Sequence, residues 1–324
     1  MKRFLNIVLT GVFAFAATSL SSPKAQGEEI RLATQAIPAY APIFVAKHKG
    51  FIQEELAKIK TTAEIKWTSF PAGPPINESF AAGQQDFGFL GDVPAIIGKS
   101  AGINTKIVAL TSSGAKTLAV VVPSKSAISS PSGLKGKKVA VVKGSYAHHL
   151  LLLVLQKGGL TVNDIELINL SQADIATALL NGNIDAAAIW EPLITKLSSQ
   201  GTVRVLADGT GIKKGVLVII ATNEFVTKNR AKTKAVLKAY KRGADFIKAN
   251  PSEAAQLIAA DVNLTPELLL PVLKKFNYNP AIQPEDIGEI KKSEAFLLSN
   301  GLIRADVNID SFVDASLTKE IGIK

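Results

Sequence analysis

The chain has 324 residues, of which 47% are hydrophobic and 20% charged, and its formal net charge is +10. It contains no cysteine, which excludes a disulfide framework and a lipid-carrying cysteine, so its stability must come from an apolar core. The basic residues are spread along the chain without an arginine-rich helix or an aromatic-basic stripe, so we expect no nucleic-acid binding. A mild positive charge is compatible with an anionic ligand.

The first residues have the layout of a secretory signal peptide. Lys2 and Arg3 precede an apolar run over 4–20, and small and polar residues follow up to Gly27. The run is short for a membrane span, which takes roughly 20 predominantly apolar residues. We therefore expect residues 1–27 to be cleaved near Ala25 or Gly27 and the mature protein to reside in the periplasm. A membrane anchor is the alternative.

Short β-type runs alternate with helical segments in the first part of the mature chain. Their apolar residues either alternate with polar ones or form short continuous runs, between helical patterns. The expected strands are 29–34, 63–70, 86–90 and 106–110, and the expected helices are 43–48, 75–82 and 93–101. Strands separated by helices of this length pair in parallel, with the helices covering the faces of the sheet.

A second unit of the same type follows. Its runs are short and apolar enough to be buried on both faces of a sheet. The expected strands are 118–122, 138–142, 165–170, 184–189, 203–207 and 215–221, and the expected helices are 149–157 and 172–180. After Phe225 the chain is largely helical, with an amphipathic helix over 228–248 and a helix that starts at Pro266.

No flexible linker separates the two units, so we expect the chain to cross between them twice, near 118–122 and 216–221. The sequence thus predicts an α/β protein with two lobes, each a mainly parallel sheet flanked by helices, joined by paired hinge strands. Residues 28–117 plus 216–324 would form lobe 1, and residues 118–215 lobe 2. The cleft between such lobes is a natural ligand site. Two independent α/β domains are the alternative.

Four loops place glycine or small polar residues between a strand and a helix. Helix N-termini expose unpaired N–H groups and partial positive charge, so such loops can bind a sulfonate, phosphate or carboxylate without arginine. For each loop alone, an ordinary capped turn is the alternative, with Asp92 as an N-cap. The candidate ligand residues are Ala72, Gly73 and Pro74, then Gly91 and Asp92, then Gly144, Ser145, Tyr146 and His148, and finally Trp190 and Glu191.

The sequence carries little catalytic chemistry. The three histidines are His48, His148 and His149, and the adjacent pair would not face each other on a helix, so we expect no metal site. At most one of the two should touch a ligand. No Gly-x-Ser-x-Gly elbow, Walker pattern or dinucleotide fingerprint occurs. Glu191 and Asp92 are expected to serve in caps or lobe-to-lobe hydrogen bonds more than in acid–base chemistry.

These loops resemble those of the periplasmic binding proteins of the sulfonate, taurine and nitrate import group, most closely the aliphatic-sulfonate-binding branch. The similar segments are 70–74, 91–94, 143–152, 188–192 and 203–210. The resemblance implies the two-lobed periplasmic binding fold of type II, closing around a small ligand. Ala72, Gly73, Gly91, Asp92 and Ser145 would line the head-group site, with Gln35 as a side-chain donor and Trp190 as a cap from lobe 2.

Two departures from that family pattern bear on the ligand. Tyr146 and Ala147 stand where the sulfonate binders often have serines, and Glu191 stands where an aspartate is usual. These changes could alter the size of the pocket and the geometry around the head group.

The resemblance implies a solute-binding component of an ABC importer. It would capture a small organosulfonate by hinge closure, as a monomer without cofactor or catalysis, and deliver it to a membrane permease and its ATPase. A binder of nitrate, taurine or a thiamine-pyrimidine precursor is the alternative. Scarce aromatic residues, at 6%, with tryptophan only at Trp67 and Trp190, argue against a ring-stacking pocket. An enzyme on the same fold is the rival from a different class, and the export signal argues against it.

Overall fold

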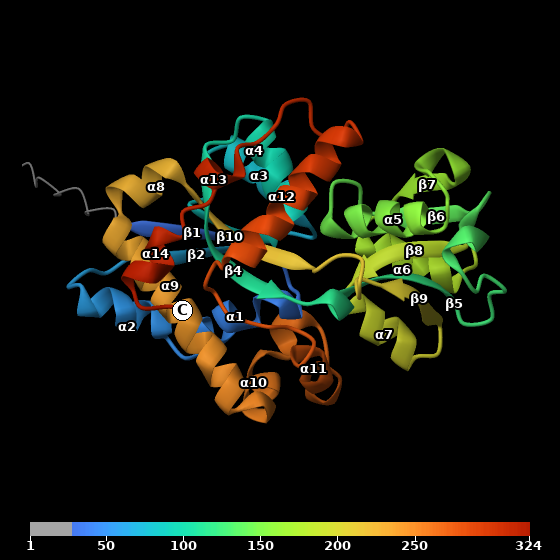
Figure 1. Cartoon of the computed structure of the whole chain (residues 1–324). Coiled ribbons are helices and arrows are strands. Elements are labelled where there is room, and N and C mark those ends of the chain that lie inside the picture. Colours follow the sequence, from blue (N-terminus) through green and yellow to red (C-terminus); the bar gives the residue numbers. More distant parts are fainter. Residues whose placement is uncertain (1–27) are drawn as a thin grey trace, which may run out of the picture.

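The computed structural model describes residues 28–324, and Figure 1 shows two groups of strands, each with its own helices. The predicted signal peptide, residues 1–27, lies outside the described residues. No helix within 28–324 is long and apolar enough to cross a membrane. We use lobe 1 for the sheet that contains the first strand, with its flanking helices, and lobe 2 for the other sheet with its helices. The predicted two-lobed α/β fold is confirmed.

The sheet of lobe 1 has the strand order β2-β1-β3-β10-β4. β1 pairs in parallel with β2 and β3, whereas β10 runs antiparallel to its neighbours β3 and β4. The strands are β1 (Glu29–Thr34), β2 (Glu64–Ser69), β3 (Phe87–Gly91), β4 (Thr105–Ser113) and β10 (Val216–Thr222). β3 is buried along its whole length, which explains its continuous apolar sequence. The edge strand β2 is largely exposed, which explains why apolar and polar residues alternate along it.

The sheet of lobe 2 repeats this plan with the order β7-β6-β8-β5-β9. β6 pairs in parallel with β7 and β8, and β5 runs antiparallel to β8 and β9. The strands are β5 (Leu118–Pro123), β6 (Lys138–Val141), β7 (Glu166–Asn169), β8 (Ala186–Trp190) and β9 (Val203–Asp208). In each lobe the one reversed strand is therefore the first strand after the chain has crossed over from the other sheet.

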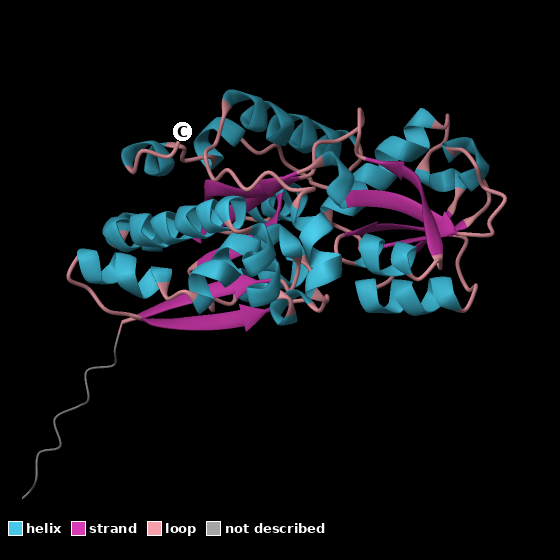
Figure 2. Cartoon of the chain, turned by 90° about the horizontal axis from the view of Figure 1, so that it is seen from below, coloured by secondary structure: helices cyan, strands magenta, loops and turns pink. Residues whose placement is uncertain are grey.

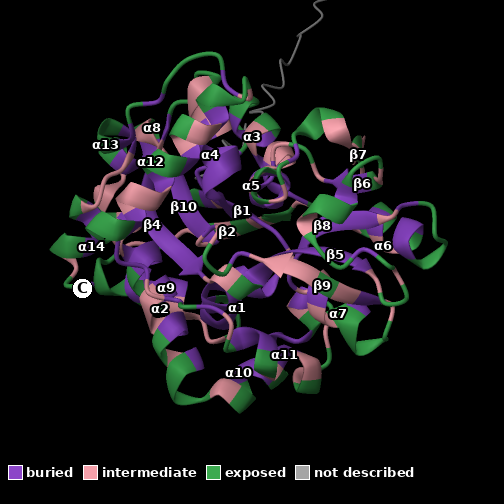
Figure 3. Cartoon of the chain, turned by 45° about the vertical axis from the view of Figure 1, so that its right-hand side comes forward, coloured by how far each residue is buried: buried purple, intermediate pink, exposed green. Residues whose placement is uncertain are grey.

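Helices flank both sheets, as Figure 2 shows, and Figure 3 shows the buried strands between them. Along the chain they are α1 (Ala41–His48), α2 (Phe51–Lys58), α3 (Gly73–Ala81), α4 (Asp92–Ser100), α5 (Tyr146–Lys157), α6 (Gln172–Leu180), α7 (Leu193–Ser199), α8 (Asn223–Lys228), α9 (Arg230–Ala249), α10 (Pro251–Ile258), α11 (Pro266–Leu273), α12 (Pro284–Ser299), α13 (Ile309–Phe312) and α14 (Ser316–Glu320).

The predicted helices differ from the structure in two omissions, α2 and α7, and in the start of α5. α2 was not expected, because only Ile52, Glu55 and Leu56 of its eight residues are buried and its apolar stripe is correspondingly short. The helix predicted over 228–248 is α9, and α8 is a separate short helix before it, from which Asn229 separates it at φ −127° and ψ 40°. α5 begins three residues earlier than expected, because Ser145 rather than a later residue caps it.

Two crossover segments, 114–117 and 209–215, connect the sheets and lie side by side. Gly114 N donates to Gly215 O at 3.0 Å, and Gly209 N donates to Ala115 O at 2.9 Å. A Cβ on Gly209 would lie 2.6 Å from Ala115 O, so this contact requires glycine. The strands before and after each segment belong to different sheets. The lobe boundaries at 117/118 and 215/216 stay a prediction.

Candidate functional site

The N-termini of α3 and α4 in lobe 1 meet the N-terminus of α5 in lobe 2, and Figure 3 shows the three helices close together. A Cβ on Gly91 would lie 3.2 Å from Tyr146 Cβ, so glycine allows the lobes to approach closely here. The contacts between the three helix starts join Gly73 with Pro94, Gly91 with Tyr146, and Gly144 with Pro74. The structure thus brings three of the four predicted loops together at these helix starts, and Trp190 of the fourth loop packs on Tyr146.

The start of α5 has the features of an anion-binding turn. Gly144 has φ +75°, which favours glycine, and Ser145 is the N-cap, whose Oγ accepts from His148 N at 3.2 Å. The first two helical N–H groups, those of Tyr146 and Ala147, have no acceptor among the described residues. Ser145 is 2% exposed, so these donors lie inside the molecule, next to lobe 1.

The loop of Ala72, Gly73 and Pro74 opens α3 from the lobe 1 side. Ala72 is the N-cap, and Pro74 lies in the first turn, where a missing N–H costs nothing. A Cβ on Gly73 would lie 2.5 Å from Pro94 Cγ, so glycine is needed where α3 and α4 touch. Ala72 and Gly73 are buried, and their contact with ligand stays a prediction.

Gln35 is buried, and both N–H bonds of its amide are already used. Its Nε2 donates to Tyr40 Oη at 3.0 Å and to Phe89 O at 3.1 Å. The expectation that Gln35 supplies a side-chain donor to a ligand stays a prediction. The amide ties the end of β1 to β3.

Asp92 does not cap α4, contrary to the sequence expectation. Gly91 occupies the N-cap position, and Asp92 is the first helical residue. Its carboxylate is fully buried, and its Oδ2 accepts from Lys213 Nζ at 2.8 Å and from Ser293 Oγ at 2.6 Å. Lys213 lies in the crossover 209–215 and is only 3% exposed, so a buried ion pair fixes this crossover to lobe 1. Lys213 is not among the predicted site residues, because it lies in an irregular segment where no periodic pattern marks a buried side chain.

Trp190 and Tyr146 pack against each other between the lobes. Their ring centroids are 5.6 Å apart, and both side chains are buried. Burial raises the pKa of Tyr146 well above its usual value, nearby Tyr40, Glu191 and Asp92 raise it further, and a hydrogen bond with Thr117 opposes them. The phenol is therefore neutral at physiological pH.

Glu191 follows Trp190 and makes a contact between the lobes. Its carboxylate accepts from Thr195 N at 3.1 Å, from Thr195 Oγ1 at 3.0 Å and from Lys275 Nζ. Lys275 lies in the segment after α11. Asn277 of the same segment forms a β-bridge with Ser113 of β4, so Lys275 belongs to lobe 1. The lobe-to-lobe role expected for Glu191 agrees with these contacts. Its carboxylate is already paired, and contact with a ligand stays a prediction.

His148 and His149 of α5 are both buried. His148 Nδ1 accepts from Gly144 N at 3.4 Å, and burial, with Lys143 nearby, lowers its pKa to about 4. His149 stacks on Phe296 of α12 with ring centroids 4.2 Å apart. Burial first, then Lys213 and His148, lower the pKa of His149 to about 2. Both imidazoles are therefore neutral at pH 7.

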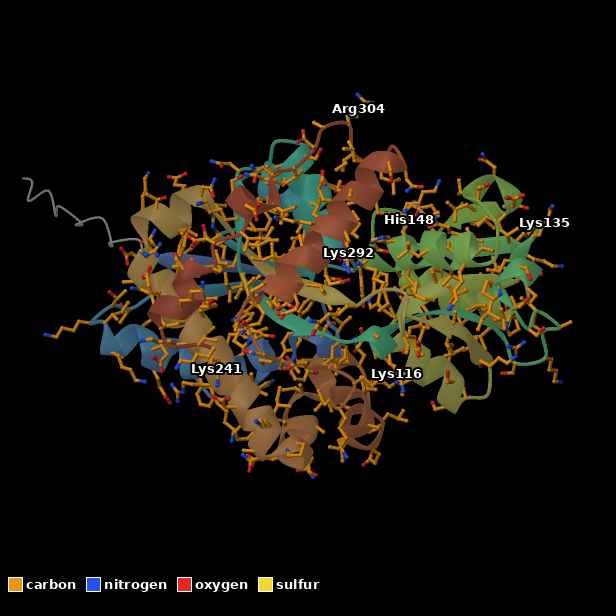
Figure 4. All side chains as sticks on the ribbon, in the orientation of Figure 1. Lys116, Lys135, His148, Lys241, Lys292 and Arg304 are labelled. Carbon is orange, nitrogen blue, oxygen red and sulfur yellow. The ribbon has the colours of Figure 1, made fainter. Side chains whose placement is uncertain are left out.

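A pocket of about 490 Å³ opens between α5 and α12, and Figure 4 places His148 between these two helices. Lys143 and His148 line it on the side of α5, and Phe296 lines it on the side of α12. No group of three or more His, Cys, Asp or Glu side chains suited to a metal ion occurs within residues 28–324.

Residues 37–254 match the family model described as NMT1/THI5 like. The chain belongs to the NMT1/THI5-like family. Among family relatives, a putative aliphatic sulfonates-binding protein of Escherichia coli (strain K12) is 32% identical over 82% of this chain and 81% of its own length. One of the same name from Bacillus subtilis (strain 168) is 30% identical over 99% and 97%. The resemblance inferred from the loops is confirmed.

Solved structures agree with this family assignment. The alkanesulfonate-binding protein SsuA from Xanthomonas axonopodis pv. citri, bound to MOPS, has a TM-score of 0.79 and 26% identity, and covers 90% of this chain and 99% of its own. The fold also occurs in an enzyme, the desulfurization enzyme DSZB, with a TM-score of 0.69 and 16% identity. That likeness concerns the fold alone.

Proposed function

We propose that this chain is the solute-binding component of an ABC importer and that it captures a small organosulfonate between its two lobes. The observation that carries the proposal is the start of α5, where a buried helix N-terminus with unpaired N–H groups faces the helix starts of lobe 1. The relatives named as aliphatic sulfonate binders support the choice of ligand.

The head group would be held by dipoles rather than by a free cation. The N–H groups of Tyr146 and Ala147 and the hydroxyl of Ser145 point to the same helix end, where partial positive charge stabilises an anion. Three donors suit the three oxygens of a sulfonate. The candidate residues Gly73, Pro74 and Gly91 would complete the site from the lobe 1 side.

The acidic side chains of the site favour a ligand without a positive charge. Asp92 is paired with Lys213, and Glu191 is paired with Lys275. Neither carboxylate is left to bind an ammonium group, so an alkanesulfonate fits better than taurine. The same pairing removes the repulsion that two bare carboxylates would exert on an anion.

Ligand binding would favour the closed arrangement of the lobes. A ligand at the start of α5 touches both lobes only when they are close, so it binds that arrangement more tightly and shifts the equilibrium toward it. The closed protein, a monomer exported to the periplasm, would then present the solute to a membrane permease driven by its ATPase.

We infer that the protein catalyses nothing. Ser145 Oγ, at the start of α5, accepts from the backbone N of His148, while the His148 ring accepts from Gly144 N. The serine and the imidazole thus form no nucleophile–base pair. Mass spectrometry of protein incubated with an alkanesulfonate should recover the compound unchanged.

Isothermal titration calorimetry with ethanesulfonate, taurine, nitrate and sulfate tests the proposal. We expect one site per chain and the highest affinity for ethanesulfonate. Binding of nitrate alone would transfer the assignment to an inorganic-anion importer. Binding of none of the four anions would refute it.

A further inference from the structure

Tyr146 of lobe 2 lies directly against lobe 1. It is the first residue of α5, and its Cβ lies 3.2 Å from the position that a Cβ on Gly91 of lobe 1 would take. Its ring lies 5.6 Å from that of Trp190, and its hydroxyl lies close to Thr117 of the first crossover. The side chain therefore contacts both lobes and the segment that joins them.

The ring has little room to move in this arrangement. Tyr146 is 4% exposed and Trp190 is 3% exposed, and the backbone of Gly91 closes the lobe 1 side. An aromatic side chain has only two rotatable bonds, and the crowding by Gly91, Trp190 and Thr117 leaves few alternative rotamers. The space beside the first two N–H groups of α5 is thus filled by a fixed ring.

We propose that Tyr146 sets the upper size limit of the ligand, so that the site takes a compact anion with a one- or two-carbon substituent and rejects longer chains. The inference rests on the proposed function, because it assumes that the anion binds at the start of α5. The Tyr146 backbone N–H would bind the head group, while its ring would occupy the volume that a longer organic tail needs.

Removal of the ring should therefore change selectivity more than affinity for the head group. Tyr146→Ala keeps the backbone donors of α5 and frees space next to them. Each methylene that enters this apolar space, and leaves water, should raise affinity about fourfold. Tyr146→Phe keeps the ring and removes only the hydroxyl that meets Thr117, so it should keep the wild-type order of preference.

Calorimetry with methane-, ethane-, butane- and hexanesulfonate on the mature chain tests this. For wild type we expect hexanesulfonate to bind at least tenfold more weakly than ethanesulfonate. In Tyr146→Ala the ratio of the two dissociation constants should shift by at least tenfold toward hexanesulfonate. Phe312→Ala, which removes a fully buried ring from α13, serves as the control for general loss of stability and should leave the ratio unchanged.

The outcomes separate this inference from the proposed function. A wild-type protein that binds all four sulfonates equally, or a Tyr146→Ala variant that keeps the wild-type ratio, would overturn the size limit and leave the sulfonate assignment intact. A wild type and Tyr146→Ala that both bind none of the series would refute the proposed function, and the size limit with it. Circular dichroism and thermal melting establish that each variant is folded before it is titrated.

Discussion

Lys213→Met should destabilise the protein strongly, because it leaves Asp92 buried without its counter-charge. Asp92 is fully buried and Lys213 is 3% exposed, so water cannot replace the lost ammonium. Removal of one partner from such a pair costs about 3–5 kcal/mol. Ser293 Oγ, 2.6 Å from Oδ2, and Val93 N, 2.9 Å from Oδ1, still donate to the carboxylate. We therefore expect a loss near the lower limit, about 3 kcal/mol.

Urea denaturation at pH 7 measures this loss in a double-mutant cycle. Asp92→Asn combined with Lys213→Met removes both charges, so the double variant should recover part of the stability lost in Lys213→Met. Lys228→Met is the control, since Lys228 and its partner Glu224 are 70% and 72% exposed, and its loss should cost at most about 1 kcal/mol. If Lys213→Met cost no more than this control, the argument from the buried pair would fail.

Three further outcomes follow from the site. Ser145→Ala should weaken ethanesulfonate binding about 10- to 150-fold, as expected for a hydrogen bond to a charged group; an unchanged dissociation constant would remove Ser145 from the site. Lys275→Met should weaken ligand binding about 5- to 30-fold, because it breaks the ion pair with Glu191 between the lobes. Small-angle X-ray scattering of this variant with ligand should show incomplete closure of the lobes. Full closure would contradict the role of the ion pair. The pKa of His149 is about 2 in the folded protein and ordinarily 6.5, so the unfolded chain binds one more proton between these values. The His149 contribution to stability is thus complete above about pH 6.5 and falls below it by up to about 1.4 kcal/mol per pH unit. Denaturation of wild type and His149→Phe at pH 7.5 and 5.5 checks this, and the same pH dependence in both would count against it.

The fold could be predicted for two reasons. Most strands are buried and therefore appear as short apolar runs in the sequence, and the loop segments resemble those of a known family. β10, an interior strand of the lobe 1 sheet, has a continuous apolar run from Val216 to Ala221, and its seven residues are buried or nearly so. The start of α5 was also visible, since Gly144 and Ser145 combine a left-handed turn with a helix cap. These features depend on residues that are close together in sequence.

The ion pairs of the site could not be predicted for the opposite reason. Lys213 lies 121 residues from Asp92, and Lys275 lies 84 residues from Glu191. Both lysines lie outside the regular helices and strands, where no periodicity reveals which side chains turn inward. A lysine in a loop is ordinarily exposed, so nothing in the sequence marks Lys213 as a buried partner.

Asp92 shows that the residues next to a helix start do not always identify its N-cap. An acid between a strand and a helix is the usual sign of an N-cap, and the chain has such an acid at this junction. The N-cap instead lies one residue earlier, at Gly91, where a Cβ would crowd Tyr146 of α5, and Asp92 is already helical and paired with Lys213. A tertiary contact thus decides the local assignment.

The most direct test of the central claim is a crystal structure of the mature protein with 2-bromoethanesulfonate, with data collected at the bromine absorption edge. We predict that the lobes enclose the ligand, with its sulfonate oxygens at hydrogen-bond distance from the N–H groups of Tyr146 and Ala147 and from Ser145 Oγ. The anomalous bromine peak should lie within a few ångströms of the start of α5. A bromine peak elsewhere on the molecule, with that helix start unliganded, would contradict the account.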